Sequence, residues 1–240
     1  MSAALAKPKT VTSDVALSGA AATLDITGAL YLADADVLVV ADLHLEKGSS
    51  LAERGQMLPP YDTRATLSAL ADAVARFAPK TVVALGDSFH DVRGPDRLDR
   101  ADRDAIAALQ AGREWIWVTG NHDRALPPTI GGEVMEELTL GSLVLRHEPA
   151  AAGAPGSGPV RELAGHLHPV GKVVMRGRAV RRRSFVTDGE RCLLPALGAY
   201  AGGLNACDPA IRGLFPQGFT AHLIGEGRIF AIGQAMLCRD

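Results

Sequence analysis

The sequence lacks the features that are typical of secreted and membrane proteins: a disulfide framework, a secretory signal and a long apolar run. It contains only three cysteines, Cys192, Cys207 and Cys238, and this odd number without a CxxC spacing predicts no disulfide framework. No apolar run reaches the ~18 residues of a membrane span, and the first residues lack the apolar stretch of a secretory signal. We therefore expect a cytoplasmic protein without a membrane partner.

Neither sign of charge dominates the composition. Lys and Arg number 25 against 27 Asp and Glu, so the formal net charge is −2. The net charge of the protein therefore does not attract a nucleic acid. Binding of such a partner would need a local basic patch or a bound metal. With 240 residues, of which 47% are hydrophobic and 22% charged, the composition is that of an ordinary globular protein. We expect residues 1–240 to form a single domain.

Short apolar runs alternate with amphipathic segments along the first half of the chain. Residues 37–40, 81–85 and 115–118 predict strands that are buried on both faces, and a hairpin is expected around Gly28. Each of the three buried strands is followed by polar side chains that are able to bind a metal. This alternation predicts an α/β fold whose site lies along one edge of a sheet.

Two helices are expected between these strands. Apolar residues recur at helical spacing over residues 62–77, with Asp62 or Thr63 as the cap and Pro79 after the end. A second helix is expected from about residue 98 to residue 109, where Gly112 follows.

The second half is richer in strand signals. Residues 134–140 and 143–146 predict a hairpin around Gly141, and residues 150–159 predict a loop of Ala, Gly, Pro and Ser. Further strands are expected at residues 172–175, 184–187, 221–224 and 228–232.

Five short segments carry polar side chains suited to catalysis. In chain order they are Asp42-x-His44, Gly86-Asp87-x-x-His90, Gly120-Asn121-His122-Asp123, His147 and Gly165-His166-x-His168. Singly, most fit a turn, a cap or a partly buried histidine as well as a site. Because most of them end a predicted strand, their joint occurrence favours one site. Oxygen and imidazole donors without thiolate suit Mn, Fe, Zn or Co better than Mg or Ca alone.

This order of motifs resembles the calcineurin-like metallophosphoesterase superfamily, whose signature is DxH, GDxx(D/H), GNH(D/E), a lone His and GHxH. The chain also resembles the bacterial branch called ligase-associated DNA damage response endonuclease PdeM, in residues 41–50, 56–63, 86–91 and 194–200. The resemblance implies a four-layer α-β-β-α sandwich with two mixed β-sheets. It also implies a manganese-dependent endonuclease in DNA repair, with single-stranded or structured DNA as substrate and a DNA ligase and a helicase as partners.

The resemblance further implies a ligand set for two divalent metal ions. One ion is assigned to Asp42, His44 and His168, the other to Asn121, His147 and His166, and Asp87 bridges both. Two ions, two carboxylates and a bridging hydroxide leave a charge of about +1, which attracts a phosphodiester, and the hydroxide would attack phosphorus in line. Because such metals recognise phosphate and not its ester group, the alternative is a phosphatase or phosphodiesterase acting on nucleotides or other small esters.

His122 is expected to stabilise the reacting phosphate or to protonate the leaving oxygen. In the superfamily a carboxylate three residues after the bridging Asp often orients this histidine, but here that position is His90. His90 resembles the GDxFH form of SbcD-type DNA repair nucleases and is either a site residue or a structural one. Asp91 and Asp123 are alternative partners for His122.

A run of basic residues without an acid follows the last motif: Lys172, Arg176, Arg178, Arg181, Arg182 and Arg183. It predicts either contacts with a nucleic-acid backbone or a solvated strand edge that is protected by charge. Lys47 and Arg54 are likewise either phosphate contacts or surface residues. Core packing is the expected role of Trp115 and Trp117, and His222 is expected to be structural.

Overall fold

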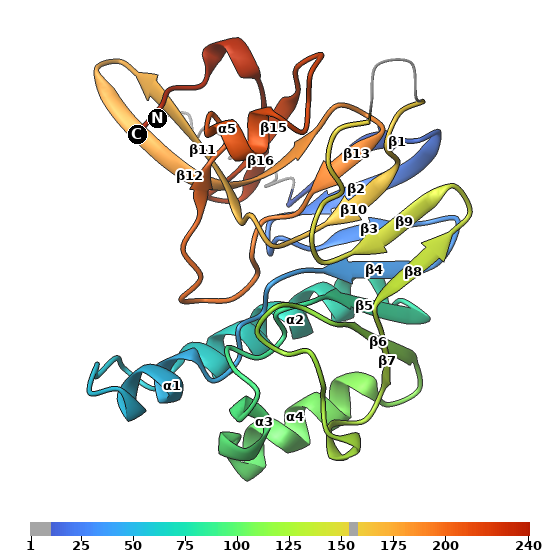
Figure 1. The fold of residues 1–240 in the computed structure, drawn as a ribbon, viewed down its shortest axis with the longest axis vertical. Coiled ribbons are helices and arrows are strands. Elements are labelled where there is room, and N and C mark those ends of the chain that lie inside the picture. Colours follow the sequence, from blue (N-terminus) through green and yellow to red (C-terminus); the bar gives the residue numbers. More distant parts are fainter. Residues whose placement is uncertain (1–10, 154–157) are drawn as a thin grey trace, which may run out of the picture.

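The computed structural model describes residues 11–153 and 158–240 as two β-sheets packed face to face (Figure 1). Within these residues the first sheet has seven strands in sequence order. They are β1 (Thr12–Leu17), β2 (Ala20–Asp25), β3 (Leu30–Leu32), β4 (Val37–Val40), β5 (Thr81–Leu85), β6 (Glu114–Val118) and β7 (Glu133–Met135). Strands β1 to β4 are antiparallel and β4 to β7 are parallel, so the sheet is mixed.

The second sheet is also mixed and has nine strands over the same described residues. They are β8 (Glu137–Leu140), β9 (Leu143–Arg146), β10 (Glu162–Ala164), β11 (Pro169–Met175), β12 (Arg178–Thr187), β13 (Arg191–Leu193), β14 (Leu204–Asn205), β15 (Thr220–Gly225) and β16 (Arg228–Gly233). Strands β9, β10 and β13 are parallel, whereas β12 is antiparallel to β11, β13 and β15.

The strand expected at residues 134–140 is wrong, because the chain changes sheets at Glu136. Residues 133–135 pair in parallel with β6 in the first sheet, and residues 137–140 pair with β9 in the second. Since the two halves bond to different partners, they cannot continue as one strand. The predicted hairpin around Gly141 is confirmed as β8 and β9.

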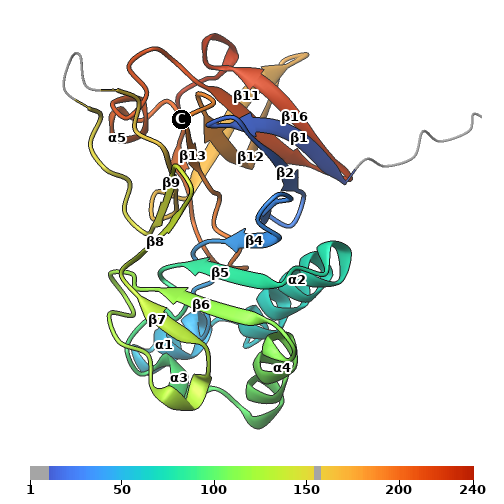
Figure 2. The ribbon, with the colours of Figure 1, turned by 90° about the vertical axis from the view of Figure 1, so that its right-hand side faces the viewer.

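Helices cover the outer faces. Against the first sheet lie α1 (Lys47–Glu53), α2 (Asp62–Phe77), α3 (Gly94–Arg97) and α4 (Arg100–Gln110), as Figure 2 shows. The short α5 (Pro209–Arg212) packs on the second sheet through Ile211. The predicted α-β-β-α sandwich with two mixed sheets is confirmed. Among residues 11–153 and 158–240, no helix is long and apolar enough to cross a bilayer.

Helix α2 has the predicted bounds, but the predicted caps are wrong. Its N-cap residue, Tyr61, makes no side-chain cap. Asp62 instead accepts a hydrogen bond from the backbone N–H of Gly48 at 2.8 Å, and Thr63 Oγ1 accepts one from Glu46 N at 2.8 Å. These two side chains therefore fasten the α1 segment to α2.

Alternation along the buried strands explains their continuous apolar runs. Val37 and Val39 of β4 belong to the core between the sheets, whereas Leu38 and Val40 pack on the helix side. Trp115 and Trp117 also lie buried in the helix-side core, so the prediction of core packing is confirmed.

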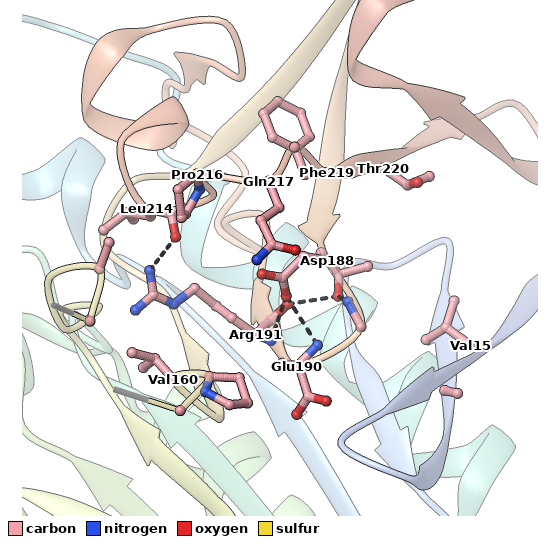
Figure 3. A pocket seen from close by; sticks show the side chains of 18 of the residues that line it. Val15, Val160, Asp188, Glu190, Arg191, Leu214, Pro216, Gln217, Phe219 and Thr220 are labelled. Atoms are coloured by element: carbon pink, nitrogen blue, oxygen red, sulfur yellow. Dashed lines mark hydrogen bonds between the residues drawn. The ribbon is translucent and has the colours of Figure 1, made fainter. Parts of the chain in front are cut away.

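A buried ion pair joins the starts of β10 and β13. Arg191 Nε lies 2.8 Å from Glu162 Oε1, and both side chains are almost wholly buried. The other guanidinium nitrogens donate to the carbonyls of Leu214 at 2.9 Å and Ala150 at 2.7 Å. Arg191 lies in the wall of a hollow of ≈ 940 Å³ (Figure 3). It connects β10 to the loop at Ala150 and to the segment that follows α5.

Removing one partner of this pair would leave the other charge buried without compensation. Arg191→Met is expected to lower the free energy of unfolding by about 3–5 kcal/mol in urea titrations. The double variant Arg191→Met/Glu162→Leu, which leaves no buried charge, should recover much of that loss. A loss below about 1 kcal/mol for the single variant would contradict this role of the pair.

Candidate metal centre

The predicted site residues of the first sheet lie where its parallel strands end. Asp42 follows β4 by two residues, Asp87 follows β5 by two, and Asn121 follows β6 by three. Because parallel strands end at the same edge, their side chains meet there.

The second sheet brings its histidines to the same place. His147 directly follows β9, and His166 and His168 lie between β10 and β11. The backbone N–H of His166 donates to Asp42 Oδ2 at 2.9 Å, which fastens this loop to the first sheet. The backbone N–H of His44 similarly donates to the carbonyl of Asp87 at 2.9 Å.

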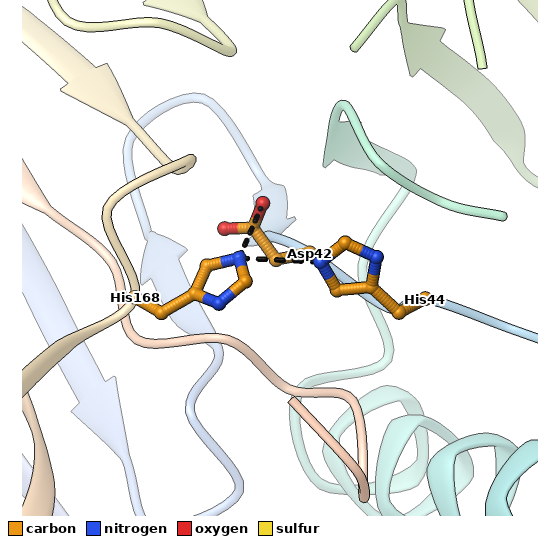
Figure 4. Close-up of side chains that lie close together, drawn as sticks. All are labelled: Asp42, His44 and His168. Carbon is orange, nitrogen blue, oxygen red and sulfur yellow. Dashed lines mark hydrogen bonds and ion pairs between the residues drawn. The ribbon is translucent and has the colours of Figure 1, made fainter. Parts of the chain in front are cut away.

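A first cluster consists of Asp42, His44 and His168, whose donor atoms all lie within 4.8 Å of one another (Figure 4). The Nε2 atoms of the two histidines face each other at 3.2 Å, and His168 Nε2 lies 3.2 Å from Asp42 Oδ1. Burial lowers the pKa of His44 to about 2, so its imidazole is neutral with a free lone pair. Burial also disfavours the charged form of His168, but the hydrogen bond and charge of Asp42 outweigh it and raise the pKa of His168.

A second cluster consists of Asp87, His147 and His166. His147 Nε2 lies 3.5 Å from Asp87 Oδ2 and 3.2 Å from His166 Nδ1. His147 Nδ1 bonds to the carbonyl of Leu85 at 3.0 Å. Since a carbonyl only accepts, Nδ1 carries the proton and Nε2 presents its lone pair to the cluster.

Asp87 belongs to the second cluster and also approaches the first. Its Oδ2 is 3.5 Å from His147 Nε2 in the second cluster and 3.9 Å from His44 Nε2 in the first. One oxygen of the Asp87 carboxylate therefore approaches nitrogen atoms of both clusters.

Most residues of the two clusters have a left-handed backbone conformation. Among the described residues, φ is positive at five members of the two clusters: Asp42 (53°), His44 (43°), Asp87 (46°), His166 (67°) and His168 (45°). L-residues seldom adopt this conformation, which costs of order 1–3 kcal/mol each. Such strain at one place favours a functional role for these residues.

Motif glycines leave room for the cluster side chains. A Cβ on Gly165 would stand 2.6 Å from Asp42 Oδ2, and one on Gly86 would stand 2.5 Å from His147 Nδ1. The convergent imidazoles and the carboxylates therefore form two cradles that fit divalent cations of the Mn, Fe, Zn or Co type.

The family model of calcineurin-like phosphoesterases matches residues 35–178, which is more than half of the chain. The chain belongs to the calcineurin-like phosphoesterase family. The family and the two clusters together make it a metal-dependent phosphoesterase.

Among solved structures, the chain is similar to the Pseudomonas putida nuclease MPE. The two share 28% identity at a TM-score of 0.71, over 92% of this chain and 100% of the nuclease. Similarity to the Escherichia coli phosphoesterase Yfce is weaker, with 14% identity and a TM-score of 0.39 over 82% of this chain and 98% of that one. No curated protein matches the chain at a significant level.

In this calcineurin-like phosphoesterase, Asn121 lies beside the second cluster with a partner that the sequence analysis missed. Asn121 Nδ2 donates to Glu148 Oε1 at 2.7 Å, and the same oxygen lies 3.8 Å from His166 Nε2. The hydrogen bond from Asn121 is the main cause that lowers the pKa of Glu148. A signal for Glu148 exists in the sequence, since it directly follows His147 at the end of β9.

His122 is held by His90, but through the backbone. His122 Nδ1 lies 2.8 Å from the carbonyl oxygen of His90, so Nδ1 carries the proton, and the two rings stack at 5.2 Å. His122 Nε2 is 3.9 Å from Asp87 Oδ2, and the side chain is 46% exposed. Burial lowers the pKa of His90 to about 4, which makes its ring neutral.

The two carboxylates considered as alternative partners of His122 are engaged elsewhere. Asp91 forms an ion pair with Arg97 at 2.9 Å. Asp123 accepts hydrogen bonds from the backbone N–H groups of Asp87 at 3.0 Å and Ser88 at 2.6 Å. Burial, helped by the Asp87 charge, raises the pKa of Asp123 to about 6 against the effect of these bonds. Asp123 therefore clamps the motif loops together.

The basic run does not form one stripe. It lies on the antiparallel pair β11 and β12 and, with Arg176, in the turn between them. Lys172 is opposite Arg181 and Gly171 is opposite Arg182, so neighbouring arginines of β12 point to different faces. Arg181 donates to the carbonyl of Gly203 at 2.7 Å, and Arg183 donates to that of Ala196 at 2.8 Å. The remaining members, Arg176, Arg178 and Arg182, are exposed.

We predict that Glu148 positions Asn121 for metal binding. Glu148→Ala should weaken the binding of added Mn²⁺ by about 10–100-fold in calorimetric titrations, because its loss frees the Asn121 amide. Glu148→Gln keeps an oxygen acceptor and should lose less. Glu136→Ala is the matched control, because Glu136 lines the same hollow beside Asn121. Equal Mn²⁺ affinities for Glu148→Ala and Glu136→Ala would disprove this role.

Proposed function

We propose that the chain is a binuclear, manganese-dependent phosphodiesterase that cleaves DNA during repair in the cytoplasm. The observation that carries the proposal is the position of Asp87 Oδ2 between two clusters of convergent donor atoms. The similarity to the P. putida nuclease supports a nucleic acid as substrate. A DNA ligase and a helicase as partners rest on the sequence resemblance alone.

The ligand assignment follows the two clusters. We assign the first ion to Asp42, His44 and His168, the second to Asn121, His147 and His166, and Asp87 to both. Bound there, two divalent cations would supply charge for the phosphoryl oxygens and lower the pKa of a water between them. Since both sheets contribute ligands, we further propose that residues 1–240 act as one domain.

His122 is the residue that we place on the reacting phosphate. The His90 carbonyl fixes the proton on Nδ1, so the exposed ring directs Nε2 to the side of Asp87. When protonated, Nε2 can donate to a phosphoryl oxygen or give its proton to the leaving oxygen. The stacked, neutral ring of His90 keeps His122 in this orientation, which makes His90 a positioning residue.

Contacts with the DNA backbone are proposed for the basic run. Arg178 and Arg182 are exposed on β12, and Arg176 is exposed in the turn before it, so all three can meet phosphates. Arg181 is also exposed but is tied to Gly203, whereas Arg183 is half-buried and supports the loop at Ala196. Any DNA contribution of Arg181 and Arg183 therefore acts through the position of this loop.

The direct test compares two substrates for the manganese-loaded protein. We expect it to convert circular single-stranded DNA to linear fragments, because only an endonuclease can open a circle, and also to hydrolyse a small aryl phosphodiester. Hydrolysis of the small ester with intact circles would reject the nuclease and favour a phosphodiesterase for nucleotides or other small esters.

Asp87→Ala should reduce hydrolysis of both substrates at least about 100-fold, because the shared ligand of both ions is lost. Metal analysis of the variant should find fewer than two ions per chain. Asp72→Ala, at an exposed carboxylate of α2, is the control and should behave like the parent. Activity of Asp87→Ala within about tenfold of the parent would refute the bridging role.

A further inference from the structure

The segment between α1 and α2 exposes three large side chains that the core does not use. Met57 is 81% exposed, Tyr61 65% and Leu58 39%. Side chains of this kind are usually buried, and an exposed group of them marks an interaction surface. We call Met57, Leu58 and Tyr61 the apolar platform.

The apolar platform is held by bonds on both sides. Tyr200 Oη donates to the carbonyl of Pro59 at 2.7 Å, and Gln56 N donates to that of Leu51 at 2.9 Å. Asp62, next to Tyr61, holds the N–H of Gly48 at 2.8 Å. Two consecutive prolines, at positions 59 and 60, stiffen the segment further. A surface ordered before binding loses little entropy when it takes up a ligand.

The platform is connected to the first metal cluster. Glu46 and Gly48, whose N–H groups bond to Thr63 and Asp62, follow the cluster residue His44 by two and four positions. The loop that carries Tyr200 is bonded to the same cluster, because the N–H of Gly198 donates to the carbonyl of Asp42 at 3.1 Å. Hydrogen bonds therefore connect the apolar platform on both sides to segments that carry or contact residues of the first cluster.

Charge favours an anionic chain on this side. Lys47 and Arg54, at the start of α1 and just after its end, have no ion-pair partner in the part of the chain that the structure describes. On the opposite side, Glu148 lies exposed beside the second cluster, in a hollow that is lined by Arg124 and Arg146 as well as by Glu136 and Glu137. A phosphate chain at the centre is attracted toward Lys47 and Arg54 beside α1.

We propose that the apolar platform binds unpaired bases of single-stranded nucleic acid on the Asp42 side of the cleaved phosphate, with Tyr61 as the main stacking surface. The inference rests on the proposed nuclease function and specifies its substrate. Aromatic side chains stack on any base, but only when the base is not paired within a duplex. The platform thus selects single strands without selecting sequence.

The test uses Tyr61→Ala with a single-stranded oligonucleotide and the small aryl phosphodiester. Relative to the aryl ester, kcat/KM for the oligonucleotide should fall about tenfold or more, mainly through KM, because stacking on Tyr61 is lost. Tyr61→Phe keeps the ring and should retain the parental ratio. Phe230→Ala is the matched control, because Phe230 is a 38% exposed aromatic residue on β16.

Three outcomes would overturn the proposal in distinguishable ways. An unchanged ratio for Tyr61→Ala, with the parent cleaving DNA, rejects the platform alone and leaves the surface to a protein partner. An equal loss for Phe230→Ala also rejects a specific platform. A parent that hydrolyses the aryl ester but neither binds nor cleaves the oligonucleotide rejects the proposed nuclease function, and the platform falls with it. Because Tyr61 is exposed, its variants should unfold at the parental temperature.

Discussion

The convergence of donor atoms at the ends of strands from two sheets is the constraint on which the site depends. Asp42, His44 and Asp87 come from the first sheet, and His147 and His166 from the second. Five cluster residues reach their positions only with a left-handed backbone, which is strained. The core between the sheets, with Leu85, Leu145 and Leu163 fully buried, holds this arrangement in place.

Backbone groups of the motif loops complete the centre. The carbonyl of Leu85 fixes the tautomer of His147, and the carbonyl of His90 fixes that of His122. Asp123 accepts hydrogen bonds from the N–H groups of Asp87 and Ser88, which joins the loops after β5 and β6. A small error in either loop would therefore displace a cluster donor and the proposed phosphate contact together.

Much of this structure could be predicted from the sequence. The strands at residues 37–40 and 81–85 and the helix at residues 62–77 have the expected bounds, because strands buried on both faces and an amphipathic helix leave strong patterns. The polar side chains that follow these strands, Asp42 and Asp87, could likewise be predicted as metal-binding residues. The break at Glu136, the caps of α2 and the partner of His122 could not be predicted, because they depend on which remote segment supplies a backbone group. Glu148 has a signal in the sequence, because it follows His147, but its contact with Asn121 joins two separate loops and could not be predicted.

Anomalous scattering from manganese-soaked crystals tests the central claim most directly. The account predicts two peaks, one among Asp42, His44 and His168 and one beside His147 and His166, with Asp87 between them and a separation of ~3.5–4 Å. A single peak, or peaks that avoid both clusters in crystals that contain manganese elsewhere, would contradict it.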